Sequence, residues 1–441
     1  MTLANKEHET SLFTNESNTS SSSAHTQSQD SGVLEKDPHM RSFLKIFVGQ
    51  SFSLMGSALV QFSLVWWLTA STGSAIVLVI ASLMAMLPQI ILSPFIGPLI
   101  DRWNRKKVMM ASDMITASAI IALAILWSQN ATGLIHVYIL MAIRSAMASF
   151  QWPALQASAS LMVPKEHLSR VNGMYQALTG LSKIAAPPLG ALLLAFIPIE
   201  LVLLIDVATA AIAIIPLLSV QVPQHFNDKD GSNQFSNLLS DVMTGVRFMK
   251  EWLAGRYITA ALMLTNFILV PTFSLLPLLV LLHFNGTIIE LAWVESLMGI
   301  GMVLGGISLG IWGGFRRRML TTAIALVSAA VGIFVVGITP PSLLPLALCG
   351  IFIAGFMIPI ASGSLMALVQ AVVPSVLQGR VFTVLMSLGP AMAPVGLLSA
   401  GFIVEVLGIQ SWFIVSSIVL ILIAIVGALT PAILNAGEIE E

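Results

Sequence analysis

Four ionisable side chains stand inside long runs of apolar residues, where such groups are rare. Two are basic, Arg144 and Lys183, and two are acidic, Asp206 and Glu295. An ionisable group in the middle of a membrane costs about 2.5–3.5 kcal/mol on insertion scales, so each one needs a partner or a function. The chemistry open to this set is ion pairing and the binding and release of protons.

A second group of charges occupies the stretch GPLIDRWNRKK at residues 97–107, although only 9% of the chain is charged. Motifs for covalent chemistry are missing, since the sequence offers no Ser/His, Cys/His or paired-Asp arrangement and no His in the middle of an apolar run. The single cysteine, Cys349, excludes an internal disulfide framework and a multi-cysteine zinc site. No GxxxxGK[ST] phosphate loop is present, so this chain does not use ATP. We expect no enzyme activity, cofactor or metal.

The composition indicates an integral membrane protein. Of the 441 residues, 56% are hydrophobic, and the mean hydropathy is +0.91. Soluble domains are about 45–50% apolar and about 25% charged, so this chain has too little polar surface for water. The formal net charge of −1 gives no reason to expect a nucleic-acid partner.

About 20 apolar residues form a helix that crosses the hydrocarbon core of a bilayer. The sequence predicts an all-α fold with twelve transmembrane helices in two related six-helix bundles, residues 41–220 and 257–434, joined by a cytoplasmic loop at 221–256. Polar tails at 1–40 and 435–441 complete the chain, and the first is expected to be disordered. The predicted spans are 43–67, 75–100, 108–128, 134–162, 171–197, 201–220, 257–282, 290–313, 319–338, 343–372, 381–405 and 412–434.

The basic residues predict the orientation. Loops on one side of the predicted spans carry Lys and Arg, including Arg102 to Lys107 and Arg316 to Arg318, and loops on the other side carry none. Basic residues concentrate in cytoplasmic loops. We therefore expect both termini to be cytoplasmic.

The two predicted halves resemble each other. VPKEHLSRV at 163–171 matches VPSVLQGRV at 373–381, with Val-Pro and Arg-Val at the same spacing. PLGALLLAFI at 188–197 likewise resembles PVGLLSAGFI at 394–403. Internal repeats of this kind are typical of transporters, whose substrate site lies near the bilayer midplane between the repeats.

Residues 97–107 resemble the signature between spans two and three of the major facilitator superfamily. IRSAMASFQWPAL with Arg144, together with SKIAAPPLGALL, is similar to drug/proton antiporters, and the whole chain most resembles the bacterial macrolide-efflux group. One departure is Asn104, where the family usually has Gly; Asn tolerates left-handed backbone better than most residues. In the second half, GGFRRRM places Gly314 near the position of the acid.

The resemblance implies a gate at this turn. Asp101 would hold the halves together on the inside against the span that begins near Arg380, and Arg102 and Arg105 would brace the turn. Basic residues alone would instead serve as a plain membrane anchor, which leaves the acid unexplained. The full set of predicted gating residues is Gly97, Asp101, Arg102, Arg105, Lys106, Asp113 and Arg380.

The four intramembrane charges are expected to lie roughly 8–15 Å below the outer ends of their spans. Lys183 and Asp206 stand on spans joined by a short loop, which favours a structural ion pair. By the family arrangement, Arg144 would face the cavity and act on a carboxylate. Glu295 has no sequence neighbour to pair with and is the first choice for the proton carrier.

The function predicted from these features is proton-coupled efflux of amphipathic compounds such as macrolides by alternating access, in the cytoplasmic membrane of a bacterium and as a monomer. A siderophore or metabolite exporter of the same fold is an alternative, and an intramembrane enzyme is an alternative of another class. Polar and aromatic side chains predicted to line the cavity are Gln61, Phe150, Trp152, Gln176, Asn266 and Gln370.

Overall fold

The computed structural model describes residues 38–220, 243–244 and 246–429. Within these ranges the secondary structure is helical, without strands. Twelve helical segments are long and apolar enough to cross a membrane, as the hydropathy pattern predicts. The tail at 435–441, and the tail at 1–40 up to residue 37, lie outside the described residues.

The first half of the chain forms six long helices. Several prolines, Pro153 and Pro216 among them, lie inside these helices, and the helix that starts at Pro38 begins five residues before the predicted span. The helices are α2 (Pro38–Thr72), α3 (Ala75–Arg102), α4 (Arg105–Ser128), α5 (Leu134–Met162), α6 (Leu168–Phe196) and α7 (Ile199–Ser219), with a short 3-10 turn at Lys165–His167.

The second half repeats this order, but two of its spans are broken. A proline in a helix removes one backbone hydrogen bond, and Pro271 and Pro390 stand just before the two breaks. The first broken span begins at Leu253, four residues before the predicted one. The helices are α9 (Leu253–Ser274) with α10 (Leu276–Leu282), α11 (Ile288–Trp312), α12 (Arg318–Ile338), α13 (Leu344–Val372), α14 (Ser375–Ala391) with α15 (Ala393–Leu407), and α16 (Ile409–Leu429), with a 3-10 turn at Pro341–Leu343.

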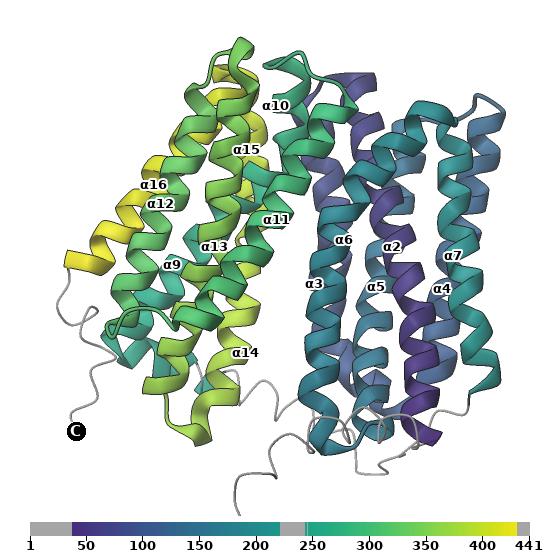
Figure 1. Ribbon diagram of the computed structural model, residues 1–441, viewed down its shortest axis with the longest axis horizontal. Coiled ribbons are helices and arrows are strands. Elements are labelled where there is room, and N and C mark those ends of the chain that lie inside the picture. The colour runs from purple at the N-terminus through teal and green to yellow at the C-terminus, as the bar shows by residue number, and fades with distance from the viewer. Residues whose placement is uncertain (1–37, 221–242, 245, 430–441) are drawn as a thin grey trace, which may run out of the picture.

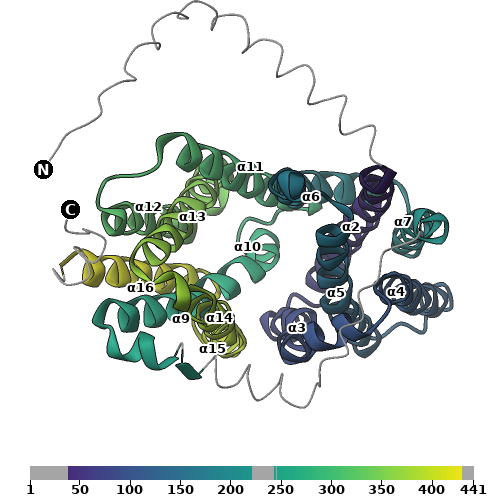
Figure 2. The same cartoon turned by 90° about the horizontal axis from the view of Figure 1, so that it is seen from below.

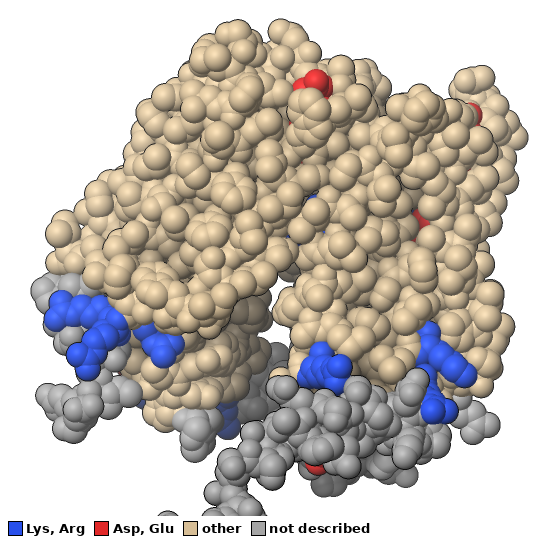
Figure 3. Space-filling model, viewed as in Figure 1, with Lys and Arg blue, Asp and Glu red and all other residues tan. Residues whose placement is uncertain are grey.

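The helices form two bundles that stand side by side, α2–α7 in one and α9–α16 in the other (Figures 1 and 2). The bundles touch where α6 packs on α11 and α3 packs on α15. Val79 and Leu83 of α3 form a small apolar cluster with Leu397 of α15. At the end of the molecule where Lys and Arg gather, the surface is hollowed between the two bundles (Figure 3). The protein is therefore open towards its basic end.

The internal repeat occupies equivalent places in the two halves. Val163 ends α5 just before the turn into α6, and Val373 ends α13 just before α14. Each Val-Pro pair therefore stands at the turn between the fourth and fifth spans of its half, and the proline that follows favours ending the helix there.

Small residues allow the helices of the second half to approach closely, a common basis of packing between membrane helices. Gly305 of α11 is buried, and a methyl group on it would overlap the carbonyl oxygen of Phe356 in α13. Its neighbour Gly306 has open space at the same position.

We expect Gly305→Ala to force α11 away from α13 and to lower stability by about 1–3 kcal/mol, the usual cost of overpacking. Gly306→Ala is the matched control and should leave stability unchanged or slightly higher, because alanine is the better helix former. Thermal unfolding of the detergent-purified variants measures both effects. Equal melting temperatures for the two variants would contradict the packing described here.

Candidate functional site

A cavity of about 380 Å³ lies between the two halves. Its walls come from α2 and α6 on one side and from α9, α10 and α11 on the other, so it can change shape when the halves move. Most of its lining is apolar, with two flexible methionines suited to ligands of varied shape. The apolar lining includes Ala58, Phe62, Val65, Ala186, Pro187, Phe273, Leu276, Met298 and Met302.

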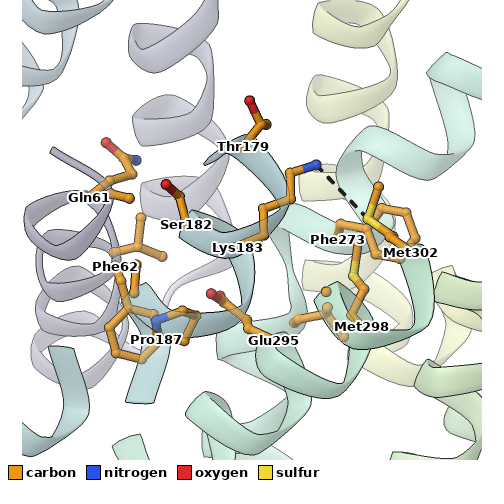
Figure 4. A pocket seen from close by; sticks show the side chains of 15 residues that line it. Gln61, Phe62, Thr179, Ser182, Lys183, Pro187, Phe273, Glu295, Met298 and Met302 are labelled. Atoms are coloured by element: carbon orange, nitrogen blue, oxygen red, sulfur yellow. Dashed lines mark hydrogen bonds between the residues drawn. The ribbon is translucent and has the colours of Figure 1, made fainter. Parts of the chain in front are cut away.

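Two charged side chains, Glu295 and Lys183, belong to this lining (Figure 4). Glu295 lies roughly 10 Å along α11 from the N-terminal end of that helix at Ile288. Among the described residues, its carboxylate has no hydrogen bond and no ion pair. The Lys183 amine donates to the sulfur of Met302, at 3.9 Å. Both charges are thus left for each other or for a ligand.

The neutral polar groups of the cavity are few. Gln61 comes from α2, and Thr179 and Ser182 come from α6. The hydroxyl of Ser182 is buried and has no hydrogen-bond partner in the described part of the chain. An unsatisfied buried hydroxyl is costly, and a polar ligand in the cavity would satisfy it.

The predicted ion pair between Lys183 and Asp206 is wrong. Asp206 pairs instead with Arg144, with 2.6 Å between Nη1 and Oδ2, and both side chains are largely buried. The Ser57 hydroxyl donates to the second Asp206 oxygen at 3.0 Å, and Arg144 also donates to the Ser57 carbonyl at 2.7 Å. The short loop misled the prediction, because α7 packs mainly on α2 and α4 while Lys183 on α6 lines the central cavity.

Arg144 is therefore not a residue of the central cavity. It lies inside the first bundle and lines a second cavity, of about 410 Å³, together with Asp113 and Asp206. Gln61 lines both cavities. This glutamine connects the polar interior of the first bundle with the space between the halves.

Asp113 does not brace the inside turn, contrary to the prediction. Its carboxylate is buried and accepts hydrogen bonds from Gln50 at 3.0 Å, Gln151 at 2.8 Å and Ser53 at 3.3 Å. Gln151 also donates to Gln50, at 2.6 Å. This arrangement ties α4 to α2 and α5 without a basic partner for Asp113 among these contacts.

The sequence contains a signal for this network in its neutral polar residues, not in its charged ones. Gln50, Ser53, Ser57 and Gln61 recur every three or four residues, so they form one polar stripe along α2. Apolar residues would be expected on a helix packed in the core of a bundle. The stripe therefore indicates a helix whose polar face lies against buried charges.

The turn after α3 is fixed to its own half by its basic residues. Arg105 donates to the carbonyl of Ala157 in α5 at 2.8 Å, and Lys106 donates to the carbonyls of Leu218 and Val220 at the end of α7 at 3.1 and 3.0 Å. Cations at a helix C-terminus stabilise the unsatisfied carbonyls there.

Asn104 differs from the expectation. Its φ is −69°, so its backbone is not left-handed, and its side chain caps α4 by accepting from the Lys107 amide. Asparagine is a favoured N-cap, which accounts for its presence in the turn.

For the remaining predicted gating residues, the structure gives the helix to which each belongs. Gly97, Asp101 and Arg102 belong to the last turns of α3, and their side chains lie outside the described part of the structure. Arg380 belongs to α14. The gate itself stays a prediction.

Of the six side chains predicted for the cavity, Gln61 lines it and the other five are not among its lining residues. Phe150 stacks on Trp103 near the basic end, and Trp152 packs edge-on against Tyr175. Asn266 donates to a carbonyl of its own helix at 2.9 Å. Gln176 and Gln370 are exposed.

Comparisons with known proteins agree with this architecture. Residues 46–394 match the Major Facilitator Superfamily. Macrolide efflux protein A of Streptococcus pyogenes is 32% identical over 387 residues, which cover 87% of this chain and 94% of that protein. Multidrug efflux pump Tap of Mycolicibacterium fortuitum is 25% identical over 374 residues, covering 83% of this chain and 90% of that protein.

Solved transporter structures share the fold. A bacterial homologue of the lysosomal transporter Spinster, in an inward-facing and unoccupied conformation, superposes with a TM-score of 0.69 at 12% identity, covering 91% of this chain and 98% of that one. Three observations indicate the same family: twelve membrane-spanning helices in two bundles, a cavity between the bundles, and the match along most of the chain. The chain belongs to the Major Facilitator Superfamily.

Proposed function

We propose that this protein exports amphipathic amines, macrolides among them, in exchange for protons. One observation carries the proposal: the apolar cavity between the halves contains a carboxylate, Glu295, without a partner among the described residues. Such a carboxylate is costly in a membrane, and either a proton or a cationic ligand removes that cost. Macrolide efflux protein A and multidrug efflux pump Tap, whose names state efflux, support the direction.

The exchange requires that Glu295 be accessible from only one side of the membrane at a time. In the state described here, the protein is open towards its basic end (Figure 3). Basic loops face the cytoplasm, so this is the state that takes up substrate from the cell. Rocking of the two halves about the contact between α6 and α11 would then open the cavity to the outside. We place the protein in the bacterial cytoplasmic membrane, as a monomer with both termini inside.

The test is expression in a bacterial strain that lacks its own drug pumps. Resistance to a panel of macrolides and other amphipathic amines should rise, and addition of a protonophore should return drug accumulation to that of the empty strain. Resistance that persists with the protonophore would show that protons do not drive the transport. No change in resistance to any compound, with the protein present in the membrane, would contradict the substrate class.

The orientation predicts which loops are accessible from outside. We expect cysteines replacing Ala131 and Ser342, both exposed at the end away from the basic loops, to react with an impermeant maleimide in intact cells. A cysteine replacing Arg316, exposed at the basic end, should react only after the membrane is opened. The three variants share a background in which Cys349 is serine. Labelling of position 316 in intact cells would reverse the orientation.

A further inference from the structure

The central cavity holds one acid and one base on opposite walls. Glu295 stands on α11 of the second half, and Lys183 stands on α6 of the first half. In Figure 4 the carboxylate points towards α6, while the lysine amine points away from it, towards Met302. The two charges line the same space but form no ion pair within 4.0 Å in this state.

The helices that carry them are in direct contact. The hydroxyl of Ser296, next to Glu295, donates to the carbonyl of Ile184, next to Lys183, at 3.1 Å. A methyl group on Gly299, one turn after Glu295, would stand 3.2 Å from the carbonyl oxygen of Lys183. The backbones at the two charged positions are therefore held close together at the contact between the halves.

Two opposite charges in an apolar cavity are expected to attract each other and to form an ion pair. An unpaired charge in a low-dielectric space is costly, and pairing with an opposite charge recovers part of that cost. Lysine carries its ammonium on a flexible stem of four carbons, so it can reach different partners by rotation alone. Its contact with a methionine sulfur is weak and easily exchanged.

We propose that Lys183 is a tethered competitor of the substrate: its ammonium pairs with Glu295 when neither a proton nor a cationic substrate neutralises that carboxylate. This inference rests on the proposed function of Glu295. A substrate amine must then displace the lysine, so Lys183 lowers the affinity for cations and excludes weakly bound ones. It is a specificity-determining residue that acts by competition.

The amount by which Lys183 lowers the affinity for a cation follows from the fraction of molecules in which Glu295 is free. If Lys183 occupies the carboxylate in about nine molecules of ten, the apparent affinity for a cation is lowered about tenfold. Removal of the lysine charge should recover this factor. A neutral ligand of similar size does not use the carboxylate, and its affinity should not change.

The experiment measures binding of tetraphenylphosphonium, a permanent cation, to the purified protein in detergent. Lys183→Met, which keeps the length of the side chain, and Lys183→Gln should each bind it about tenfold more tightly than the unaltered protein. Lys183→Arg should bind like the unaltered protein. Lys45→Met removes an exposed charge at the basic end of α2 and is the matched control.

The decisive comparison repeats Lys183→Met in a Glu295→Gln background. Competition for Glu295 predicts no gain there, whereas simple charge repulsion by Lys183 predicts the same gain as before. A gain in both backgrounds, or no gain in either, would overturn the inference. Equal binding by the unaltered protein and Glu295→Gln would instead overturn the proposed role of Glu295, so the two failures are distinguishable.

Discussion

Glu295→Gln is expected to abolish proton-driven efflux while the protein stays folded in the membrane. Glutamine has the shape of the protonated acid but neither releases a proton nor attracts a cation, so the variant is held in one of the two forms that exchange requires. Because Glu295 has no hydrogen bond or ion pair among the described residues, its replacement by a side chain of the same shape removes no polar interaction there. Accumulation of a fluorescent amphipathic amine in cells should rise to that of the empty strain.

Glu290→Gln is the matched control, since Glu290 stands in the first turn of the same helix and caps it through Thr287. Glutamine at the third helical position also completes a capping box, so efflux should continue. Full pH-dependent efflux by Glu295→Gln would exclude Glu295 as the proton carrier. Asp113, buried and hydrogen-bonded without a basic partner among its contacts, would then be the next acid to examine.

Arg144→Met is expected to cause the largest loss of stability. It leaves the Asp206 carboxylate buried without its cation, and breaking a buried pair from one side costs about 3–5 kcal/mol. The Ser57 carbonyl loses its donor as well. We expect membrane abundance to fall sharply and thermal unfolding of the remaining protein to occur at a much lower temperature.

A second substitution separates pairing from other effects. Adding Asp206→Leu to Arg144→Met removes the stranded charge, and replacing a whole buried pair by apolar residues is often neutral or stabilising. Stability should therefore return in the double variant. Removal of the Lys183 charge should give no such recovery, since Lys183 does not contact Asp206. Recovery of stability by a Lys183 variant would instead support the ion pair between Lys183 and Asp206 that the sequence predicted.

The fold could be predicted from the sequence because it depends on strong, local signals. Length and hydropathy alone define the twelve spans, which the structure confirms. The two breaks in the second half were not predicted, although Pro271 and Pro390 stand beside them. A proline within a long apolar run is compatible with either a kinked or an interrupted helix, and packing against the neighbouring helices decides between them.

The site was harder to predict because it depends on which face of each helix is directed towards the cavity and which towards the neighbouring helices. Glu295 was identified from its isolation in an apolar run, a property of the sequence itself. The partner of Asp206 was not, since nearness along the chain favoured Lys183 while the packing of α7 on α2 brings Arg144 beside it. Residue type alone predicts Phe150 and Trp152 for the cavity, whereas in the structure they pack on Trp103 and Tyr175.

The central claim is that Glu295 exchanges protons for an amphipathic cation in the cavity between the halves. Its most direct test uses proteoliposomes that contain the purified protein and a pH-sensitive dye, with erythromycin added to one side under an imposed pH gradient. We expect erythromycin to accelerate the decay of the gradient in liposomes with the unaltered protein and not in those with Glu295→Gln. Proton movement that ignores erythromycin, or that is the same for both proteins, would contradict the account.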